Sequence, residues 1–371
     1  MDPSRTPVFS GIWEWNLIKE LIDQQAKKLG IAIDADPKTI SEILNQIAPD
    51  CAKDLYKDLK KDASEMIAYE TERRRTFEAE NYAIWKEAFD LIEMQLKVNC
   101  EIIGRFISEV GPLIVEEERP LFSAISALHG NGCLVAQEIF ALMRAGFASA
   151  ALARWRKLYE IEITALYLEQ NGKGVGNDLA TRYLDYSIVE KYKSVKLYEN
   201  PEVFENHSKR LGYEPYPKDV IDALKARYNQ LRDTKGSGFC QDYGWAHSES
   251  MKEPTLITLA RSVKLGHLYP YYQLANDAVH SGPGSIFWNI SLPVNSGNAV
   301  LIGPTGYGMA DPGQLLTLSL NRLNFALLAL HPSLVAREIL TINNWLTDEI
   351  MESLKNINNI VDSEGGTTDQ Q

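Results

Sequence analysis

His280 is the residue whose type and position best suit chemistry. It ends the run YPYYQLANDAVHSGPG at 269–284, where helix-like apolar spacing stops at Ser-Gly-Pro-Gly. An imidazole can give or take a proton near neutral pH, so His280 could act as a general acid or base, with Asn276 or Asp277 one turn earlier orienting the ring. The alternative is that His280 only caps the helix, because a protonated histidine is favourable at a helix C-terminus and Ser281-Gly282 fits a chain reversal. Both interpretations stay open.

A second polar group interrupts the apolar segment ARWRKLYEIEITALY. Arg154, Arg156, Lys157, Glu160 and Glu162 stand there among tryptophan, leucine and isoleucine. Arg156 and Glu160 are four residues apart and can pair on one helix face, whereas Arg154 and Lys157 share another face. A buried cation requires an anion, so Arg154 is expected to face a carboxylate, a bound phosphate or water. The group is either a ligand-binding site or an internal network of salt bridges.

Other motifs in the sequence limit which kinds of catalytic or metal site can be predicted. His247, in YGWAHSE, is a second loop histidine and a further candidate ligand-binding residue. The segment GPTGYG lacks the Gly-Lys-Ser/Thr of a phosphate loop, and HSGPGS lacks the G-x-S-x-G order of a nucleophile elbow. No zinc signature combines histidine with glutamate. We therefore predict neither a metal nor a cofactor.

Composition indicates which ligands the surface can attract and in which cellular compartment the protein is expected. The 371-residue chain carries a net charge of −12 with a pI near 5.1, which opposes binding of polyanions by the whole surface but leaves room for a local basic site. No apolar run is long enough to cross a bilayer, and no secretory signal is visible. The four cysteines are far apart and contain no C-x-x-C pair, which suits free thiols in a reducing compartment. A cytoplasmic protein is expected.

Helical periodicity dominates the chain. Residues 51–110 contain no proline and predict one long helix or two shorter helices. Further helices are expected over 120–143, 149–171, 178–198, 254–262, 311–330 and 333–356, with Gly146 and Ser149 as caps at one turn. The glycine- and proline-rich stretch at 281–311 predicts an irregular loop or one small hairpin. The expected fold is an all-α antiparallel helical bundle.

Three regions are predicted along the chain. Residues 1–95 form an N-terminal helical extension that can reach a protein partner, residues 96–356 form the helical core domain, and residues 357–371 form a disordered tail. The aromatic-rich helices of the core can also support a homo-oligomer.

Two stretches together resemble a family of uncharacterised bacterial α-helical proteins. They are LMRAGFASAALARWRKLYEIEITALYL and LARSVKLGHLYPYYQLANDAVHSGP. In that family, an Ala-x-x-Arg-x-x-x-Glu helix precedes a Tyr-x-x-x-Ser/Ala-x-x-x-His helix. More distantly, the chain resembles the HEPN superfamily, which includes metal-independent ribonucleases of toxin and phage-defence systems. In those enzymes four to six residues separate an arginine from the histidine, and no arginine stands at that spacing before His280 in this chain. By that resemblance His280 is the catalytic acid or base, and Arg154 or Arg156 supplies the cation.

Three hypotheses follow for function. The first is a metal-independent endoribonuclease or toxin-type effector acting on RNA, in phage defence. The second is a non-catalytic helical module that binds a nucleotide, a small anion or a partner protein near Arg154 and His280. The third is a structural protein that dimerises through its aromatic helices.

Overall fold

The fold is all-α, as the sequence predicts. The computed structural model describes residues 27–28, 37–199, 216–280, 282, 289–293 and 301–365, and within these ranges it contains helices, turns and one isolated bridge between Ser248 and Met251. Spatial proximity divides the chain into two compact units, Met1–Phe77 and Glu78–Gln371, each described here by itself. The predicted regions 1–95, 96–356 and 357–371 stay predictions, because a compact unit in space need not fold independently.

The first long element is a single helix. Helix α2 runs over Pro37–Val110, so the stretch at 51–110 forms one helix rather than two, and Pro37 occupies its first turn. In the first unit, Arg73 pairs with Glu70 at 2.8 Å and Arg75 with Glu72 at 3.9 Å, all of them exposed. These pairs make that part of α2 a solvated face.

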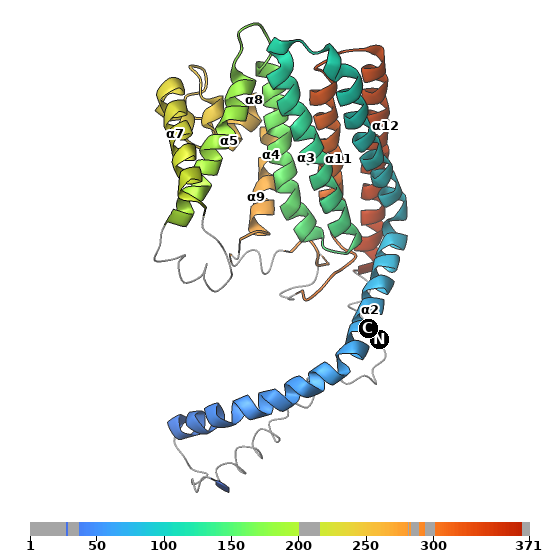
Figure 1. Ribbon diagram of the computed structural model, residues 1–371. Helices are drawn as coiled ribbons and strands as arrows, with labels where there is room; N and C mark the ends of the chain where they lie inside the picture. Colours follow the sequence, from blue (N-terminus) through green and yellow to red (C-terminus); the bar gives the residue numbers. More distant parts are fainter. Residues whose placement is uncertain are drawn as a thin grey trace. The chain divides into compact units, whose positions relative to one another are not determined.

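The second unit contains a bundle of long helices. Figure 1 shows α3 (Arg119–Arg144), α4 (Ala148–Asn171), α11 (Ala310–Leu328) and α12 (Leu334–Gly365) side by side, and α3, α4 and α11 pack against one another. Short connections reverse the chain between α3 and α4 and between α11 and α12. Two 3₁₀ turns, Gly111–Leu113 and Glu116–Glu118, lead from α2 into α3. The predicted antiparallel bundle is therefore confirmed.

A second group of helices covers the other side of α4. Helices α5 (Leu179–Lys196) and α7 (Lys218–Lys235) pair with each other, and α8 (Leu256–Ser262) and α9 (Tyr269–Asp277) both pack on α4. Between α7 and α8, the 3₁₀ turns Ser237–Cys240 and Gly244–Ala246 form a compact loop. Helix α4 is thus covered from two sides.

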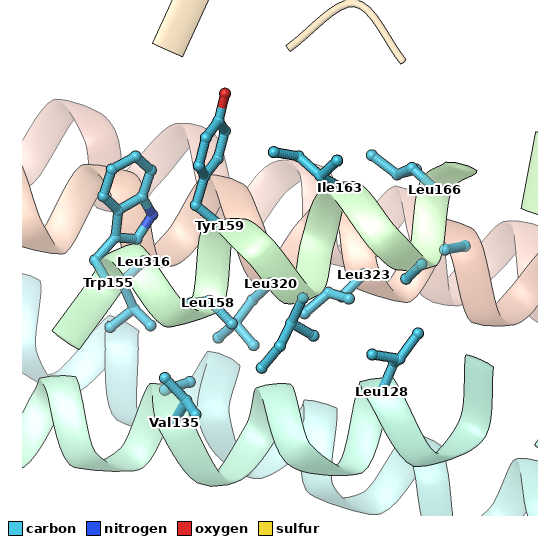
Figure 2. Packing of buried hydrophobic residues seen from close by; sticks show 14 of the residues in the cluster. Leu128, Val135, Trp155, Leu158, Tyr159, Ile163, Leu166, Leu316, Leu320 and Leu323 are labelled. Carbon is cyan, nitrogen blue, oxygen red and sulfur yellow. The ribbon is translucent and has the colours of Figure 1, made fainter. Parts of the chain in front are cut away.

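Apolar side chains at helical spacing bind the bundle together (Figure 2). On α4, Trp155, Leu158 and Tyr159 are fully buried, and Leu316, Leu320 and Leu323 of α11 follow one another by four and three residues on the facing side. Leu128 and Val135 of α3, seven residues apart, complete the contact. Burial of a large apolar side chain of this kind contributes about 1.5–3 kcal/mol.

Two local predictions differ from the structure. Ser149 does not cap α4, because the helix begins at Ala148 with Phe147 at its cap; the Ser149 hydroxyl instead donates to Asn289 Oδ1. Gly146 does follow the end of α3, with a φ of 84° that favours glycine. Helix α12 continues to Gly365, beyond the expected end near 356, since Ile357 and Val361 maintain apolar contact with the core.

The irregular segment after α9 is anchored to the start of α4. Ser291 Oγ accepts the backbone N–H of Ser149 at 3.2 Å, and the backbone N–H of Thr305 donates to Gly146 O at 3.0 Å. The described parts, 289–293 and 301–309, contain turns and bends without a strand. The β-prone residues 286–288 and 299–300, on which the alternative of a hairpin depends, lie outside the described residues.

Two glycines of α3 give a matched test of this packing. A Cβ built on Gly132 would lie 2.6 Å from Leu323 Cδ1 of α11, whereas a Cβ on Gly130 would meet nothing within 4 Å. We expect Gly132→Val to lower the free energy of unfolding by about 1–3 kcal/mol through overpacking. Gly130→Ala should raise it by about 0.5–1 kcal/mol through helix propensity. Urea denaturation measures both, and equal effects of the two changes would contradict the close contact of α3 with α11.

Candidate functional site

Helix α9 is fixed to α4 by its own entry turn. A capping box of Thr255 and Thr258 starts α8, and Lys264 takes a φ of 63° where the chain turns toward α9. The Tyr159 hydroxyl of α4 then donates to Leu265 O at 2.9 Å. The rings of Tyr159 and Tyr272 lie 5.7 Å apart, so aromatic packing continues from the turn into α9.

A polar cluster lies where α4 meets α9. Arg156 Nε donates to the Tyr272 hydroxyl oxygen at 2.9 Å, and the Tyr272 hydroxyl donates to Glu160 Oε1 at 3.1 Å. Arg156 Nε also lies 3.5 Å from Glu160 Oε1, which confirms the predicted pair. The Arg156 guanidinium lies 5.0 Å from the centre of the Tyr272 ring. These three residues, with Tyr243, are called the Arg156–Tyr272 cluster below.

Tyr243 reaches this cluster from the loop between α7 and α8. Its backbone is left-handed, with a φ of 56°. Burial raises the pKa of the Tyr243 hydroxyl, and Glu160 raises it further while Arg156 opposes the change. Burial also raises the pKa of Tyr272. Both hydroxyls therefore stay protonated at neutral pH and can donate hydrogen bonds.

Arg182 of α5 holds the loop that carries Tyr243. Its Nε donates to Trp245 O at 3.0 Å, and its Nη2 donates to Gly244 O at 3.3 Å and to His247 O at 3.0 Å. The Trp245 ring packs edge-on against Tyr183, at 5.0 Å between centroids. One guanidinium thus fixes three carbonyls within four residues of backbone beside the cluster.

Arg156 keeps part of its hydrogen-bonding capacity. Its side chain is 32% exposed, and among the residues that the structure describes no acceptor engages its terminal nitrogens, Nη1 and Nη2. A guanidinium held at Nε presents those two groups in a planar fork, which matches two oxygens of a phosphate or carboxylate. The geometry therefore allows an oxyanion to bind beside the two tyrosine hydroxyls.

The other predicted residues of α4 lie elsewhere. Arg154 is two residues from Arg156, about 200° around the helix, and its Nε pairs with Glu138 of α3. Of the partners considered for Arg154, the structure thus shows a carboxylate. Lys157 is exposed. The described contacts bring Arg156 and Glu160 together with α9 and leave Arg154 on the α3 side.

His280 lies just beyond the end of α9. Its side chain is exposed, and its backbone N–H donates to Asn276 O at 2.9 Å, continuing the helical pattern. Asn276 Nδ2 reaches Gln273 Oε1 at 3.5 Å, and Asn276 Oδ1 is buried without a hydrogen-bond partner among the described residues. Asp277 is exposed. Eight residues separate Tyr272 from His280, or about 12 Å at helical rise, so the imidazole stands apart from the Arg156–Tyr272 cluster.

His247 belongs to the same loop as Tyr243 but points elsewhere. The residue is exposed, and its ring packs over Gly238, where an added Cβ would meet the imidazole at 3.2 Å. Its carbonyl, not its ring, contributes to the loop through Arg182. No described contact joins the rings of His247 and His280.

Glu162, the remaining carboxylate of the α4 group, is part of a separate buried network. It is fully buried, and it accepts hydrogen bonds from Ser319 Oγ at 2.6 Å and from Arg322 Nη1 at 2.8 Å. Trp155 Nε1 donates to Ser319 Oγ at 3.1 Å. Burial raises the pKa of Glu162, while Arg322 and Ser319 oppose that shift. This network joins α4 to α11, so the predicted internal salt bridges and a half-exposed cluster coexist on one helix.

The comparison with protein families bears on this region. Residues 122–297 match DUF5677, a family of unknown function. The matched stretch contains α3 from residue 122 onward and all of α4, α5, α7, α8 and α9, and with them the whole Arg156–Tyr272 cluster and His280. Neither the search of curated proteins nor the search of solved structures finds a match.

Membrane-spanning helices and metal-binding clusters are both absent from the described residues. In the described ranges, no helix combines the length and apolar character that a bilayer crossing requires. Among the same residues, no three His, Cys, Asp or Glu side chains gather in a way that could hold a metal ion.

Removal of Arg322 tests the buried network. We expect Arg322→Ala to lower the free energy of unfolding by about 3–5 kcal/mol, because it leaves the Glu162 carboxylate buried without its cation. Arg154→Ala, which breaks a half-exposed ion pair on the same bundle, should cost about 0–1 kcal/mol. Urea denaturation of both variants measures the difference. Similar losses in the two variants would show that the Glu162–Arg322 pair is not a special support of α4.

Proposed function

We propose that the Arg156–Tyr272 cluster binds the phosphate group of a nucleotide. The observation that supports this most directly is the state of Arg156, which is held at Nε by Tyr272 and Glu160 and is 32% exposed. Its terminal nitrogens can then take two phosphate oxygens in a bidentate arrangement, which is the geometry that favours arginine over lysine at phosphate sites.

A nucleotide suits the cluster better than a bare anion. Glu160 lies 3.5 Å from Arg156 and repels a free anion, so binding requires further contacts. Glu160 can accept a hydrogen bond from a ribose hydroxyl, and the hydroxyl of Tyr243 can donate to a phosphate oxygen. Tyr271, exposed on the adjacent face of α9, offers a ring on which a base can stack.

Thermal unfolding with adenosine and guanosine monophosphates tests this proposal. A ligand at about ten times its Kd should raise the Tm by about 2 °C, because it binds the folded state alone. We expect Arg156→Ala to abolish the shift and Arg156→Lys to reduce it, since lysine keeps the charge but lacks the planar fork.

Arg154→Ala is the matched control, because Arg154 has the same side chain, similar exposure and an ion pair through the same Nε atom. It should keep the full shift in Tm. A shift that survives in Arg156→Ala, or the absence of a shift with both nucleotides at millimolar concentration, would refute the proposal.

RNA cleavage is the second candidate function, and the exposed imidazole of His280 favours it. His280 follows the helix that carries Tyr272, about 12 Å away, which corresponds to three or four nucleotides of a helical strand. A strand bound through one phosphate at Arg156 can therefore present another to His280. Attack by the ribose 2′-hydroxyl needs a group that moves a proton and requires no metal, as the resemblance to HEPN ribonucleases implies.

Incubation of single-stranded RNA with the protein in the presence of EDTA tests this second function. We expect cleavage that His280→Ala reduces by about 100-fold or more, the usual contribution of a general acid or base. His331→Ala, a histidine at the connection between α11 and α12, should cleave as the unchanged protein does. Equal cleavage by His280→Ala would reject the catalytic role of His280 and leave the nucleotide-binding proposal unaffected.

A further inference from the structure

Three helices bring a second group of reactive side chains together, away from the Arg156–Tyr272 cluster. On α3, His129, Cys133 and Gln137 recur every four residues and so share one face. Gln137 Nε2 lies 3.7 Å from Cys100 Sγ of α2 and donates to Cys133 O at 3.2 Å. The two thiols are therefore neighbours across the contact of α2 with α3.

His129 and Asn324 fix the inner thiol. His129 Nε2 lies 2.8 Å from Asn324 Oδ1 of α11, so Nε2 carries the proton and donates it to that oxygen. The other nitrogen, Nδ1, then accepts from Cys133 Sγ at 3.6 Å. Burial lowers the pKa of His129 to about 4, which keeps the ring neutral and suited to this role.

The arrangement of thiol, imidazole and amide resembles that of cysteine hydrolases, but burial excludes that chemistry. Cys133 and His129 are 5% and 1% exposed, which leaves no room for a substrate. Burial also raises the pKa of the Cys133 thiol to about 12, with the neighbouring Cys100 contributing. Cys133 can therefore react only with a group already in contact with it.

Cys100 is the thiol that neighbours Cys133 through Gln137, and it is open to solvent. We propose that Cys100 and Cys133 form a dithiol site that reacts with hydroperoxides, in which Cys100 is oxidised first and Cys133 then closes a disulfide between α2 and α3. An exposed cysteine next to a resolving cysteine is the arrangement found in thiols that sense oxidants.

The reaction has two balanced steps. The Cys100 sulfur attacks a hydroperoxide, the O–O bond breaks, an S–O bond forms, and the departing alkoxide takes the thiol proton and leaves as an alcohol. Cys133 Sγ then attacks Cys100 Sγ, the S–O bond breaks, and the departing hydroxide takes the proton of Cys133 to give water. Two thiols are oxidised to one disulfide, and one hydroperoxide is reduced.

The proximity of Cys100 compensates for the low fraction of thiolate at Cys133. A thiol of pKa about 12 is ionised in about one molecule in 10⁵ at neutral pH. Groups held in reacting geometry gain effective concentrations of about 10⁵–10⁸ M, which offsets that deficit for the neighbour Cys100 and for nothing else. The same argument explains why Cys133 stays reduced until Cys100 has been oxidised.

Peptide mapping after treatment with hydrogen peroxide tests the proposal. The protein is oxidised, its free thiols are blocked with N-ethylmaleimide, and the digest is analysed by mass spectrometry without reduction. We expect a linked peptide that joins Cys100 to Cys133 and that dithiothreitol separates. In Cys133→Ser, dimedone should instead trap a persistent sulfenic acid at Cys100, whereas Cys100→Ser should leave Cys133 unoxidised.

Cys240→Ser is the matched control, because Cys240 is equally buried and lies in another part of the fold. It should form the linked peptide as the unchanged protein does. Circular dichroism checks that each variant is folded, and the linked peptide of the unchanged protein is informative by itself. The proposal is overturned by the absence of that peptide, or by equal dimedone labelling of Cys100 with and without Cys133.

Discussion

Helix α4 is covered by α3, α11 and α9, and a helix covered on several sides must find a partner for every polar side chain that it carries. Removal of an unpaired charge from water costs several kcal/mol, so each such residue selects its own neighbour. Glu162 takes Arg322 and Ser319 of α11, Arg154 takes Glu138 of α3, and Arg156 takes Tyr272 of α9. Each of these three helices therefore contributes a polar partner for α4 beside its apolar contacts.

The three pairings differ in how many hydrogen-bonding groups they leave free to bind a ligand. Around Glu162, both carboxylate oxygens accept hydrogen bonds, one from Arg322 and one from Ser319, and the carboxylate itself is fully buried. At Arg156, the hydrogen bonds to other described residues engage only Nε, and the side chains of Arg156 and Glu160 are 32% and 27% exposed. A completed network stabilises a fold, whereas an incomplete one at the surface is free to bind. This contrast is the physical basis for placing a ligand at Arg156 instead of at Glu162 or Arg154.

Local sequence patterns predicted most of the helices and one of the pairings. The spacing of Arg156 and Glu160 needs only the geometry of a single helix, and so does the run that became α2. Tyr272 and Tyr243 could not be found in this way, because they come from segments about a hundred residues further along the chain, and no local period encodes that distance. The only signals were the repeated tyrosines of YPYYQ and a tyrosine placed before glycine in DYGW.

The lack of long-range information in local patterns also explains the wrong cap at Ser149. It explains too why the sequence does not tell which arginine of α4 contacts α9. Ser149 has the residue type of a helix cap, but Asn289 and Ser291 compete for its hydroxyl and backbone, and their approach depends on the tertiary fold. The spacing pairs Arg156 with Glu160, but which of the two arginines faces α9 follows only from the neighbours of each helix face. His280 was placed correctly at a helix exit, but its separation from the cations of α4 depends on where along α4 the short helix α9 docks.

The hold of Arg182 on the loop between α7 and α8 has a mechanical consequence. The Arg182 guanidinium is bonded to the carbonyls of Gly244, Trp245 and His247, so these residues are held together as one rigid segment. A shift of any one of them would break its hydrogen bond to Arg182. Any tilt of α5 is therefore carried as a whole to Tyr243, one residue before the first of those carbonyls. The position of Tyr243 beside Arg156 is in this way tied to α5.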